Sequence, residues 1–410
     1  MRPCGVRAFC RHARLRAGYA SHIPGGPRAP RPRARHHAVR LHRSPAPDPR
    51  PPGRHPTDPA TQTAPPDLDG DGQPDGGTAD DPVPLDTFDW AVCADGTADF
   101  TALQPAVDAA APGDAIGVCP GTYGPFTVAY GQDVTIASTH GPTQTTLDGG
   151  DDTAVFVHEG TLRLAGFTVT GTGVDEEWST DHGGAFTVEE GDLTVADAVV
   201  TGVQGPFALV FDENLLLMDD VVWTGNDVDV LWFLWQGDDA TFTGNTVTGG
   251  TYAGIGTGGR LGAAHLRHNV FADLTIDAAR TALSFTSTDE IGPMLLENNV
   301  FYDVDDLDPW GGRLVSDNVT FRNNIVQGCA SGDLVPFWGA YNAFFDNQTS
   351  YDGVATGAGN LEGLDPLLVD PEGGDFHLQP GSPAIDAGDP GPTYVDADGS
   401  RNDIGRYGGR

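Results

Sequence analysis

Carboxylate, imidazole and indole side chains are concentrated in one short stretch of the chain, residues 172–184. Its candidate side chains are Glu176, Glu177, Trp178, Asp181 and His182. Asp and His can perform general acid–base catalysis, paired carboxylates can hold calcium, and an indole can stack on a sugar ring. The stretch therefore predicts a reactive loop or, since acidic residues are abundant in this chain, a solvated acidic turn.

Two arginines end the next irregular stretches and could complete such a site. Arg280 ends ADLTIDAAR (272–280), and Arg313 follows VDDLDPWGG (304–312). A guanidinium can stabilise negative charge that develops in a transition state. We assign catalysis to Asp181, His182, Arg280 and Arg313, and substrate contacts to Glu176, Glu177, Trp178 and Trp310. The alternative is that both arginines only pair with nearby carboxylates.

A repeat along the chain indicates the elements that must position these residues. Seven short segments align: GFTVTG (166–171), DAVVTG (197–202), DVVWTG (220–225), GNTVTG (244–249), HNVFAD (268–273), NNVFYD (298–303) and NNIVQG (323–328). Other short apolar strands precede them, such as LRLA, LTVA, AHLR, MLLE and VTFR. Because one such unit cannot cover its own apolar face, a period of roughly 24 residues predicts stacked coils of a β-solenoid.

One column of asparagines supports the same architecture. Asn245, Asn269, Asn299 and Asn324 occupy equivalent positions at the turn between two strands of the repeat. Amides stacked in this way can hydrogen-bond along the column and satisfy polar groups that face the interior. We expect a structural role for these four residues.

Two longer stretches resemble a known superfamily. DGTADFTALQPAVDAAAPGDAIGVCPGTYGPFTV (95–128) resembles the N-terminal cap and first coil of pectate-lyase-like β-helix proteins, and residues 359–390 with 396–409 resemble the ending of bacterial surface β-helix proteins. The resemblance spans residues 93–409. It implies an all-β, right-handed parallel β-helix with a short N-terminal capping helix, and strands of a first parallel sheet near 185–188, 207–210, 230–233, 253–256, 282–285 and 313–316.

The resemblance also implies where an active enzyme of this superfamily would hold its substrate. Its lyases place a cleft along the first parallel sheet and use Arg or Lys as base, with calcium bridging the substrate to Asp and Glu. This chain has no lysine, so Arg280 or Arg313 would have to serve. We find no polygalacturonase-like Asp pairs followed by Gly-His-Gly, the carboxylate arrangement of hydrolases in this superfamily.

The segments outside the solenoid differ from it in composition. Residues 1–55 are rich in Arg and Pro and indicate a disordered arm or an incorrectly assigned start that hides an export signal; residues 56–86 form an acidic Pro/Asp/Gly linker. The solenoid spans 87–345, and 346–410 are its C-terminal coils and tail. The linker contains a calcium-loop-like motif, and its ligands would be Asp67, Asp69, Asp71 and Asp75.

The cysteines and the net charge limit the compartment and the partners that this chain can have. Cys93 and Cys119 are about one coil apart and predict either a disulfide between adjacent coils or two buried thiols. Residues 61–410 carry nine arginines against 56 acidic residues, which excludes nucleic acid as a partner. With no transmembrane stretch, we expect a monomeric, secreted or cell-surface protein.

Two functions fit these features. The first is a non-catalytic surface protein with an adhesive or glycan-binding role, whose partner is a polysaccharide or cell-envelope glycan. The second is a calcium-assisted polysaccharide lyase or other carbohydrate-active enzyme, with its cleft along the first sheet. The absence of lysine and of a complete catalytic signature favours the first, and the sequence leaves open whether the protein is an enzyme.

Overall fold

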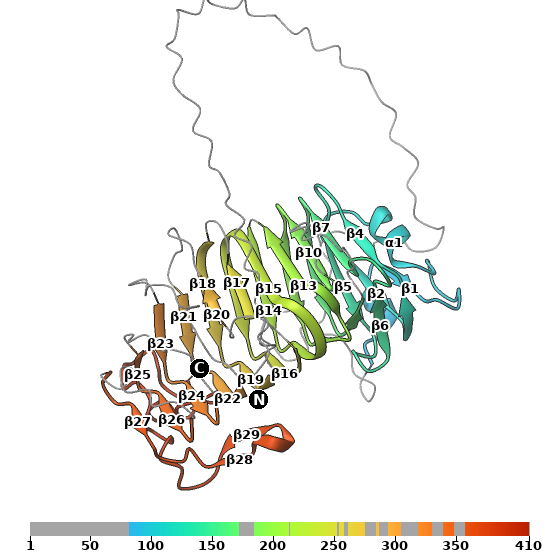
Figure 1. Ribbon diagram of the computed structural model, residues 1–410. Coiled ribbons are helices and arrows are strands. Elements are labelled where there is room, and N and C mark those ends of the chain that lie inside the picture. Colours follow the sequence, from blue (N-terminus) through green and yellow to red (C-terminus); the bar gives the residue numbers. More distant parts are fainter. Residues whose placement is uncertain are drawn as a thin grey trace, which may run out of the picture. The chain divides into compact units, whose positions relative to one another are not determined.

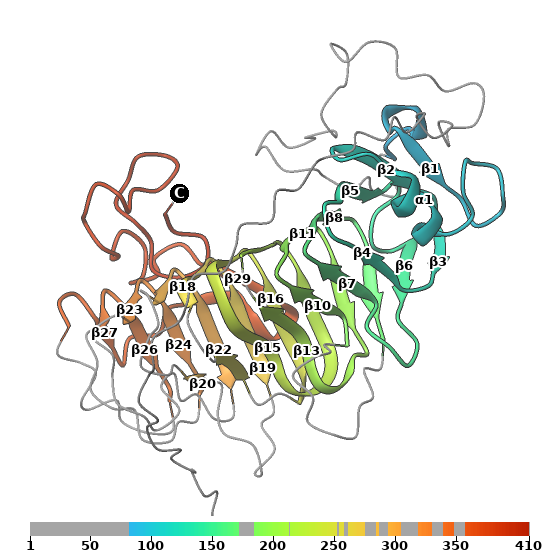
Figure 2. The same ribbon diagram turned by 90° about the horizontal axis from the view of Figure 1, so that it is seen from above.

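The chain is a right-handed parallel β-helix in the computed structural model (Figure 1). The structure describes residues 82–171, 184–212, 214–251, 254–257, 261–274, 284–286, 294–304, 319–329, 339–347 and 357–409. Each coil contributes up to three short strands, and strands of successive coils pair in parallel register (Figure 2). The strands thus form three columns, which we call the first, second and third columns in the order in which a coil passes through them.

The strand bounds follow this threefold division. The first column contains β4 (Phe126–Val128), β7 (Val155–His158), β10 (Phe186–Glu189), β13 (Gln204–Asp212), the middle of β15 (Val222–Thr243), β17 (Gly254–Thr257) and β20 (Ser284–Thr286). The second contains β1 (Trp90–Val92), β2 (Asp114–Val118), β5 (Asp133–Ser138), β8 (Thr161–Ala165), β11 (Asp192–Ala196), β14 (Leu215–Asp219), the end of β15, β18 (Leu261–Arg267), β21 (Met294–Glu297), β23 (Val319–Arg322) and β25 (Gly339–Ala340). The third contains β3 (Gly121–Tyr123), β6 (Thr145–Asp148), β9 (Thr168–Thr170), β12 (Val199–Thr201), the start of β15, β16 (Thr246–Thr251), β19 (Val270–Leu274), β22 (Val300–Val304), β24 (Ile325–Gln327), β26 (Ala343–Phe345) and β27 (Leu361–Glu362).

Apolar residues at alternate positions of these strands fill the interior. Since successive side chains of a strand point to opposite faces, every second one enters the solenoid and stacks on its equivalent in the next coil. Phe271 and Phe301, register partners in successive coils, stack with ring centroids 5.2 Å apart, and Trp232 stacks on Phe242 of the same coil at 3.9 Å. Trp223 and Trp232 are fully buried and belong to the core.

The turn from the second to the third column has one repeated backbone conformation. The residue that begins it has a positive φ in nine successive coils: Gly166, Asp197, Asp220, Gly244, His268, Asn298, Asn323, Tyr341 and Gly359. Glycine and asparagine adopt this left-handed region at low cost, which explains their frequency there. We call these nine residues the turn strip.

A buried asparagine follows the turn strip in the later coils. The four asparagines expected from the sequence, together with Asn342 and Asn360, form one hydrogen-bonded ladder. At Asn269, Nδ2 donates to Asn299 Oδ1 at 3.0 Å and to Phe242 O at 2.9 Å, while Oδ1 accepts from the backbone N–H and Nδ2 of Asn245. Each interior rung therefore uses both its donors and its acceptor without water.

The N-terminal end of the solenoid is closed by the expected short helix. A 3-10 turn, η1 (Leu85–Thr87), precedes β1, and α1 (Leu103–Ala109) buries Leu103, Ala106 and Val107 against the first coils. Capping of this kind protects the otherwise unpaired apolar end of a solenoid. Beside it, Cys93 and Cys119 form a disulfide with their Cα atoms 5.0 Å apart.

After β27 the chain folds back along the outside of the solenoid. We call residues 364–409 the C-terminal segment; it contains β28 (Leu368–Asp370), η2 (Pro371–Gly373) and β29 (Asp375–Leu378). Its Leu368, Phe376, Ala384 and Ile404 bury the outward side chains of the third column in a second apolar cluster with Val270, Val300, Ile325 and Ala343. Figure 1 shows β28 and β29 beside β22, β24 and β26.

The sequence predicted this fold correctly. The fold class, the capping helix and the solenoid are confirmed. Five expected first-sheet strands overlap β10, β13, β15, β17 and β20, and the stretch 313–316 lies outside the described residues. No helix among the described residues is long and apolar enough to span a bilayer.

The ladder should contribute more to stability at its centre than at its end. Asn299→Ala removes the acceptor of the Asn269 backbone N–H, one of the two acceptors of Asn269 Nδ2 and the side-chain donor to Leu266 O, so we expect a loss of about 2–5 kcal/mol in the free energy of unfolding in urea. Asn360→Ala, at the half-buried last rung, is the matched control and should cost less. Equal losses would contradict the role of the ladder as a buried network.

Candidate functional site

Most residues that the sequence suggested for chemistry lie outside the described residues. These are the catalytic candidates Asp181, His182, Arg280 and Arg313, the substrate-binding candidates Glu176, Glu177, Trp178 and Trp310, and the calcium candidates Asp67, Asp69, Asp71 and Asp75. Their roles stay predictions. The described residues instead contain a pocket at a different place.

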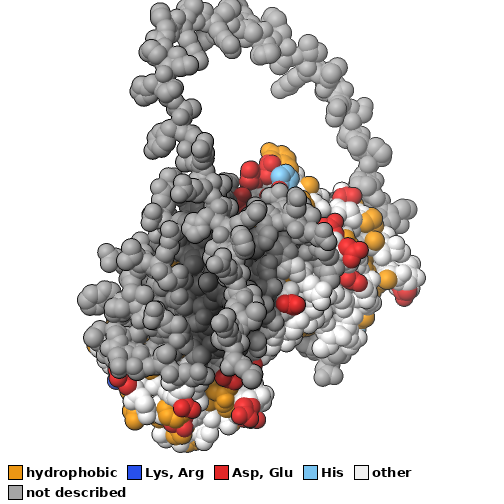
Figure 3. Space-filling view, viewed as in Figure 1, with side chains coloured by type: hydrophobic (Ala, Val, Ile, Leu, Met, Phe, Trp, Pro, Cys, Tyr) orange, Lys and Arg blue, Asp and Glu red, His pale blue; other side chains and the backbone are white. Residues whose placement is uncertain are grey.

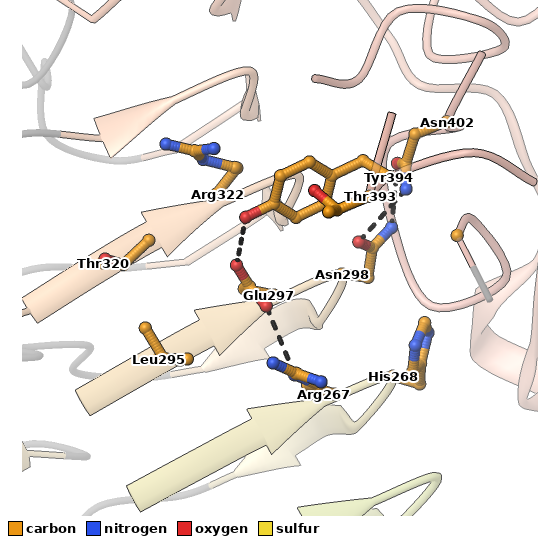
Figure 4. A pocket seen from close by; sticks show the side chains of 11 residues that line it. Arg267, His268, Leu295, Glu297, Asn298, Thr320, Arg322, Thr393, Tyr394 and Asn402 are labelled. Carbon is orange, nitrogen blue, oxygen red and sulfur yellow. Dashed lines mark hydrogen bonds and ion pairs between the residues drawn. The ribbon is translucent and has the colours of Figure 1, made fainter. Parts of the chain in front are cut away.

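The pocket lies on the outer face of the second column, beside the ends of β18, β21 and β23, and the C-terminal segment forms its opposite wall (Figure 4). Its volume is about 410 Å³. It is lined by Arg267, His268, Leu295, Glu297, Asn298, Thr320, Arg322, Thr393, Tyr394, Asn402 and Gly409. Only one of these side chains, Leu295, is aliphatic.

Strand alternation and register place the charged side chains in one row. Arg267, Glu297 and Arg322 end β18, β21 and β23, and they are register partners in adjacent strands. Their inner neighbours Leu266, Leu296 and Phe321 are buried in the core, so the charged side chains must point outward. Opposite charges on neighbouring strands attract, and the row alternates in sign.

Glu297 is the centre of this row. Its side chain is only 9% exposed, and Oε2 lies 3.2 Å from Arg267 Nε. The Tyr394 hydroxyl donates to Oε1 at 2.8 Å, as Figure 4 shows. Burial raises the pKa of Tyr394, and the adjacent Glu297 carboxylate adds to this effect, so the phenol remains protonated at neutral pH. Both carboxylate oxygens are therefore engaged.

Arg322 joins the row to the C-terminal segment. It forms an ion pair with Asp389, and its guanidinium carbon lies 5.1 Å from the centre of the Tyr394 ring. Its Nε is buried without a hydrogen-bond partner among the described residues. The side chain is thus held by charge and by the ring, with donor capacity left over.

The C-terminal segment is also bonded to successive residues of the turn strip. Asn298 Nδ2 donates to Asn402 Oδ1 at 3.1 Å, and Asn323 Oδ1 accepts from Asp389 N at 2.8 Å. Nδ1 of His268 donates to Arg406 O at 2.8 Å. Arg406 itself reaches Thr246 Oγ1 at 2.7 Å. These contacts span several coils and fix the wall of the pocket.

Positive charge is concentrated here in an otherwise acidic protein. The described residues include five arginines, and four of them, Arg267, Arg322, Arg401 and Arg406, lie in the pocket or in the contacts that dock the C-terminal segment. On the face shown in Figure 3, acidic side chains recur over the described surface and basic ones are scarcely visible. The fifth, Arg163, pairs with Asp133 at 2.8 Å.

The outer face of the first column carries a smaller polar group. His158 Nδ1 lies 3.1 Å from Glu189 Oε2, and the His158 ring stacks on Phe156. No group of three His, Cys, Asp or Glu side chains in the described part of the chain is placed to hold a metal ion, and the calcium prediction stays untested. Near the C-terminus, Asp396 accepts hydrogen bonds from the backbone N–H groups of Asp403 and Gly409, and Asp398 accepts one from Ser400 N.

Sequence reasoning missed this pocket although its residues stand in the quoted repeat. AHLR, MLLE and VTFR end in Arg267, Glu297 and Arg322, directly before the turn strip. The available signal was a charged residue at the end of each of three strands in successive coils. Tyr394 and Asp389 could not be linked to it, since they join the row only because the C-terminal segment folds back.

Comparisons with known proteins match the fold alone. No family model and no curated protein matches the chain. Among solved structures, a mutant of the PL6 family alginate lyase AlyGC is 12% identical with a TM-score of 0.37, covering 71% of this chain and 41% of its own. An Escherichia coli protein, YbhC, is 12% identical with a TM-score of 0.27, covering 61% of this chain and 73% of its own. The chain thus spans less than half the length of that lyase, and these scores carry no argument about activity.

The pocket has the chemistry of a binding site for a hydroxyl-rich ligand. Guanidinium, carboxylate, amide and hydroxyl groups line it, and its volume lies within the range of about 300–1,000 Å³ usual for small-molecule sites. Its charged groups already neutralise one another, so it presents many hydrogen-bonding groups without a large net charge.

Docking of the C-terminal segment should weaken as the pH falls. Burial lowers the pKa of His268 below 6.5, and the nearby Arg267 and Arg406 reinforce this, against its hydrogen bond to Arg406 and the Glu297 charge. When the segment is undocked, the imidazole would titrate near its ordinary pKa of about 6.5. As the pH falls, the undocked state therefore takes up a proton before the docked state does. The docked state loses stability as the pH falls from about 6.5 towards the lowered pKa.

Hydrogen–deuterium exchange of residues 388–409 at pH 7 and pH 5 would measure this effect. We expect lower protection factors at pH 5 than at pH 7 in the native chain, each calculated against the intrinsic exchange rate at that pH. His268→Asn keeps a residue that tolerates the left-handed turn, as at Asn298 and Asn323, and should reduce the pH dependence. Any dependence that persists in this variant belongs to other groups, such as Asp403, whose pKa burial raises. An unchanged dependence would exclude His268 as its source.

Proposed function

We propose that this chain is a non-catalytic, glycan-binding β-helix protein of the cell exterior, and that the pocket beside β18, β21 and β23 binds a sugar unit. The observation that carries the proposal is the pocket lining, in which two arginines flank a buried glutamate beside tyrosine and threonine hydroxyls. Sugar hydroxyls donate and accept hydrogen bonds, and a lining that supplies both kinds of partner suits them.

The rigid support of the pocket favours binding. Arg267, Glu297 and Arg322 lie at the ends of paired strands, and each adjoins a turn residue in the same left-handed conformation. Side chains held in this way lose little conformational entropy when a ligand binds, which favours affinity for a small polar ligand. The fold contributes the platform and the site contributes the function.

An extracellular location is supported by the disulfide and by the charge. Disulfides persist in oxidising compartments and are rare in the cytosol, and Cys93–Cys119 clamps the capped end of the solenoid. The acidic surface keeps such a protein soluble and away from other polyanions. A role in binding envelope or matrix glycans is consistent with both features.

Ligand binding should depend on the pocket and on no other part of the second column. We expect the full chain to bind members of a glycan array, with the affinity then measured by calorimetry. Leu295→Trp places an indole in the pocket and should abolish binding. Leu217→Trp is the matched control, because Leu217 points outward in the same row of the same column several coils away. No binding to any glycan, or equal loss in both variants, would contradict the proposal.

The loss of one hydroxyl should weaken binding without altering the fold. Thr320→Val removes a hydrogen-bonding group from the pocket and should lower affinity about three- to tenfold. Thr241→Val makes the same change in the same outward row and should leave affinity unchanged.

Incubation of the full chain with polyuronates, with and without calcium, tests the non-catalytic part of the proposal. Formation of unsaturated products would show that the protein is a lyase instead.

A further inference from the structure

We infer that the pocket is selective for an uncharged sugar unit and discriminates against the corresponding uronate, an inference that rests on the proposed function. The superficial chemistry of the site suggests the opposite, since arginines are the usual partners of carboxylates. The contacts of each arginine decide the matter.

Both pocket arginines already have carboxylate partners from the protein. Arg267 Nε faces Glu297 Oε2 at 3.2 Å, and Arg322 is paired with Asp389. The side chains of Glu297 and Asp389 are only 9% and 13% exposed, so neither carboxylate can be released to water without moving the C-terminal segment. The carboxylates of Glu297 and Asp389 already neutralise the two arginines. A ligand carboxylate would therefore add a third negative charge with no positive charge left to balance it.

The position of Glu297 makes this third charge costly. It lies between the two arginines in the row; one of its oxygens forms an ion pair with Arg267, and the other accepts a hydrogen bond from Tyr394. A carboxylate bound to either guanidinium would approach a fixed like charge in a partly buried site, where screening by water is weak. A ligand hydroxyl in the same place carries no charge and can donate to an oxygen or accept from an N–H.

The groups that remain available match hydroxyls better than carboxylates. Thr320 and Thr393 bring hydroxyls to the lining, and Arg322 Nε is a buried donor without a hydrogen-bond partner among the described residues. An ionised carboxylate can only accept, whereas the pocket offers acceptors as well as donors. The acidic surface of the chain adds a long-range repulsion of anionic glycans.

A paired binding experiment tests this selectivity. Glucose, galactose and mannose, each with its uronate counterpart, are titrated into the full chain at pH 7. We expect the neutral member of at least one pair to bind at least about tenfold more tightly than its uronate. Repeating the titration near 1 M salt, where the Debye length is about 3 Å, removes the long-range repulsion, and the preference should persist because it arises inside the pocket.

A single substitution should shift the preference. Asp389→Asn frees Arg322 to pair with a ligand carboxylate and leaves an oxygen that can still accept from Gly391 N. The ratio of uronate to neutral-sugar affinity should rise about tenfold or more. Glu362→Gln removes one negative charge from exposed β27 and is the matched control, with an unchanged ratio. Exchange of residues 388–409 verifies that the segment remains docked.

The outcomes separate this inference from the proposed function. Tighter binding of a uronate by the native chain, or an affinity ratio that Asp389→Asn does not raise, would overturn the selectivity and leave glycan binding standing. Absence of binding to both members of every pair and to the glycan array would overturn the proposed function itself. A preference for the neutral sugar that declines in Asp389→Asn would support both.

Discussion

Satisfying a buried polar turn is the constraint on which the C-terminal half of this solenoid depends. At the junction of the second and third columns the backbone takes a left-handed residue and then enters the interior, where its amide groups have no water. The asparagine ladder supplies the missing partners, each rung binding the coil before it and the coil after it. With the turn fixed, the strands on either side keep one register over successive coils.

That register produces the site as well as the core. Successive side chains of a strand point to opposite faces. The last residue of each second-column strand points outward, because the residue that precedes it points into the core. Arg267, Glu297 and Arg322 therefore form a row. The same regularity exposes the turn strip as a line of polar groups at regular intervals. The C-terminal segment binds to that line and thereby brings Tyr394 and Asp389 to the charged row. A repeat with no chemistry of its own thus assembles a pocket from residues about a hundred positions apart.

The sequence was sufficient for the architecture and insufficient for the pocket. The β-helix followed from seven aligned segments because interactions between coils repeat with the chain, and a periodic pattern records them. The pairing of Tyr394 with Glu297 repeats nowhere, so no pattern could indicate it. The reactive candidates of residues 172–184 and their arginine partners remain predictions, because they lie outside the described residues.

The return path of the C-terminal segment changes how the solenoid can fold. An array of coils in which each touches only its neighbours can form progressively as the chain is synthesised. Here Arg406 holds Thr246 and Gly244, residues made about 160 positions earlier. The coils between them cannot reach their final stability until Arg406 has left the ribosome. A truncated nascent chain would therefore remain incompletely locked, and the C-terminal half of the array should behave as a single cooperative unit rather than as separable repeats.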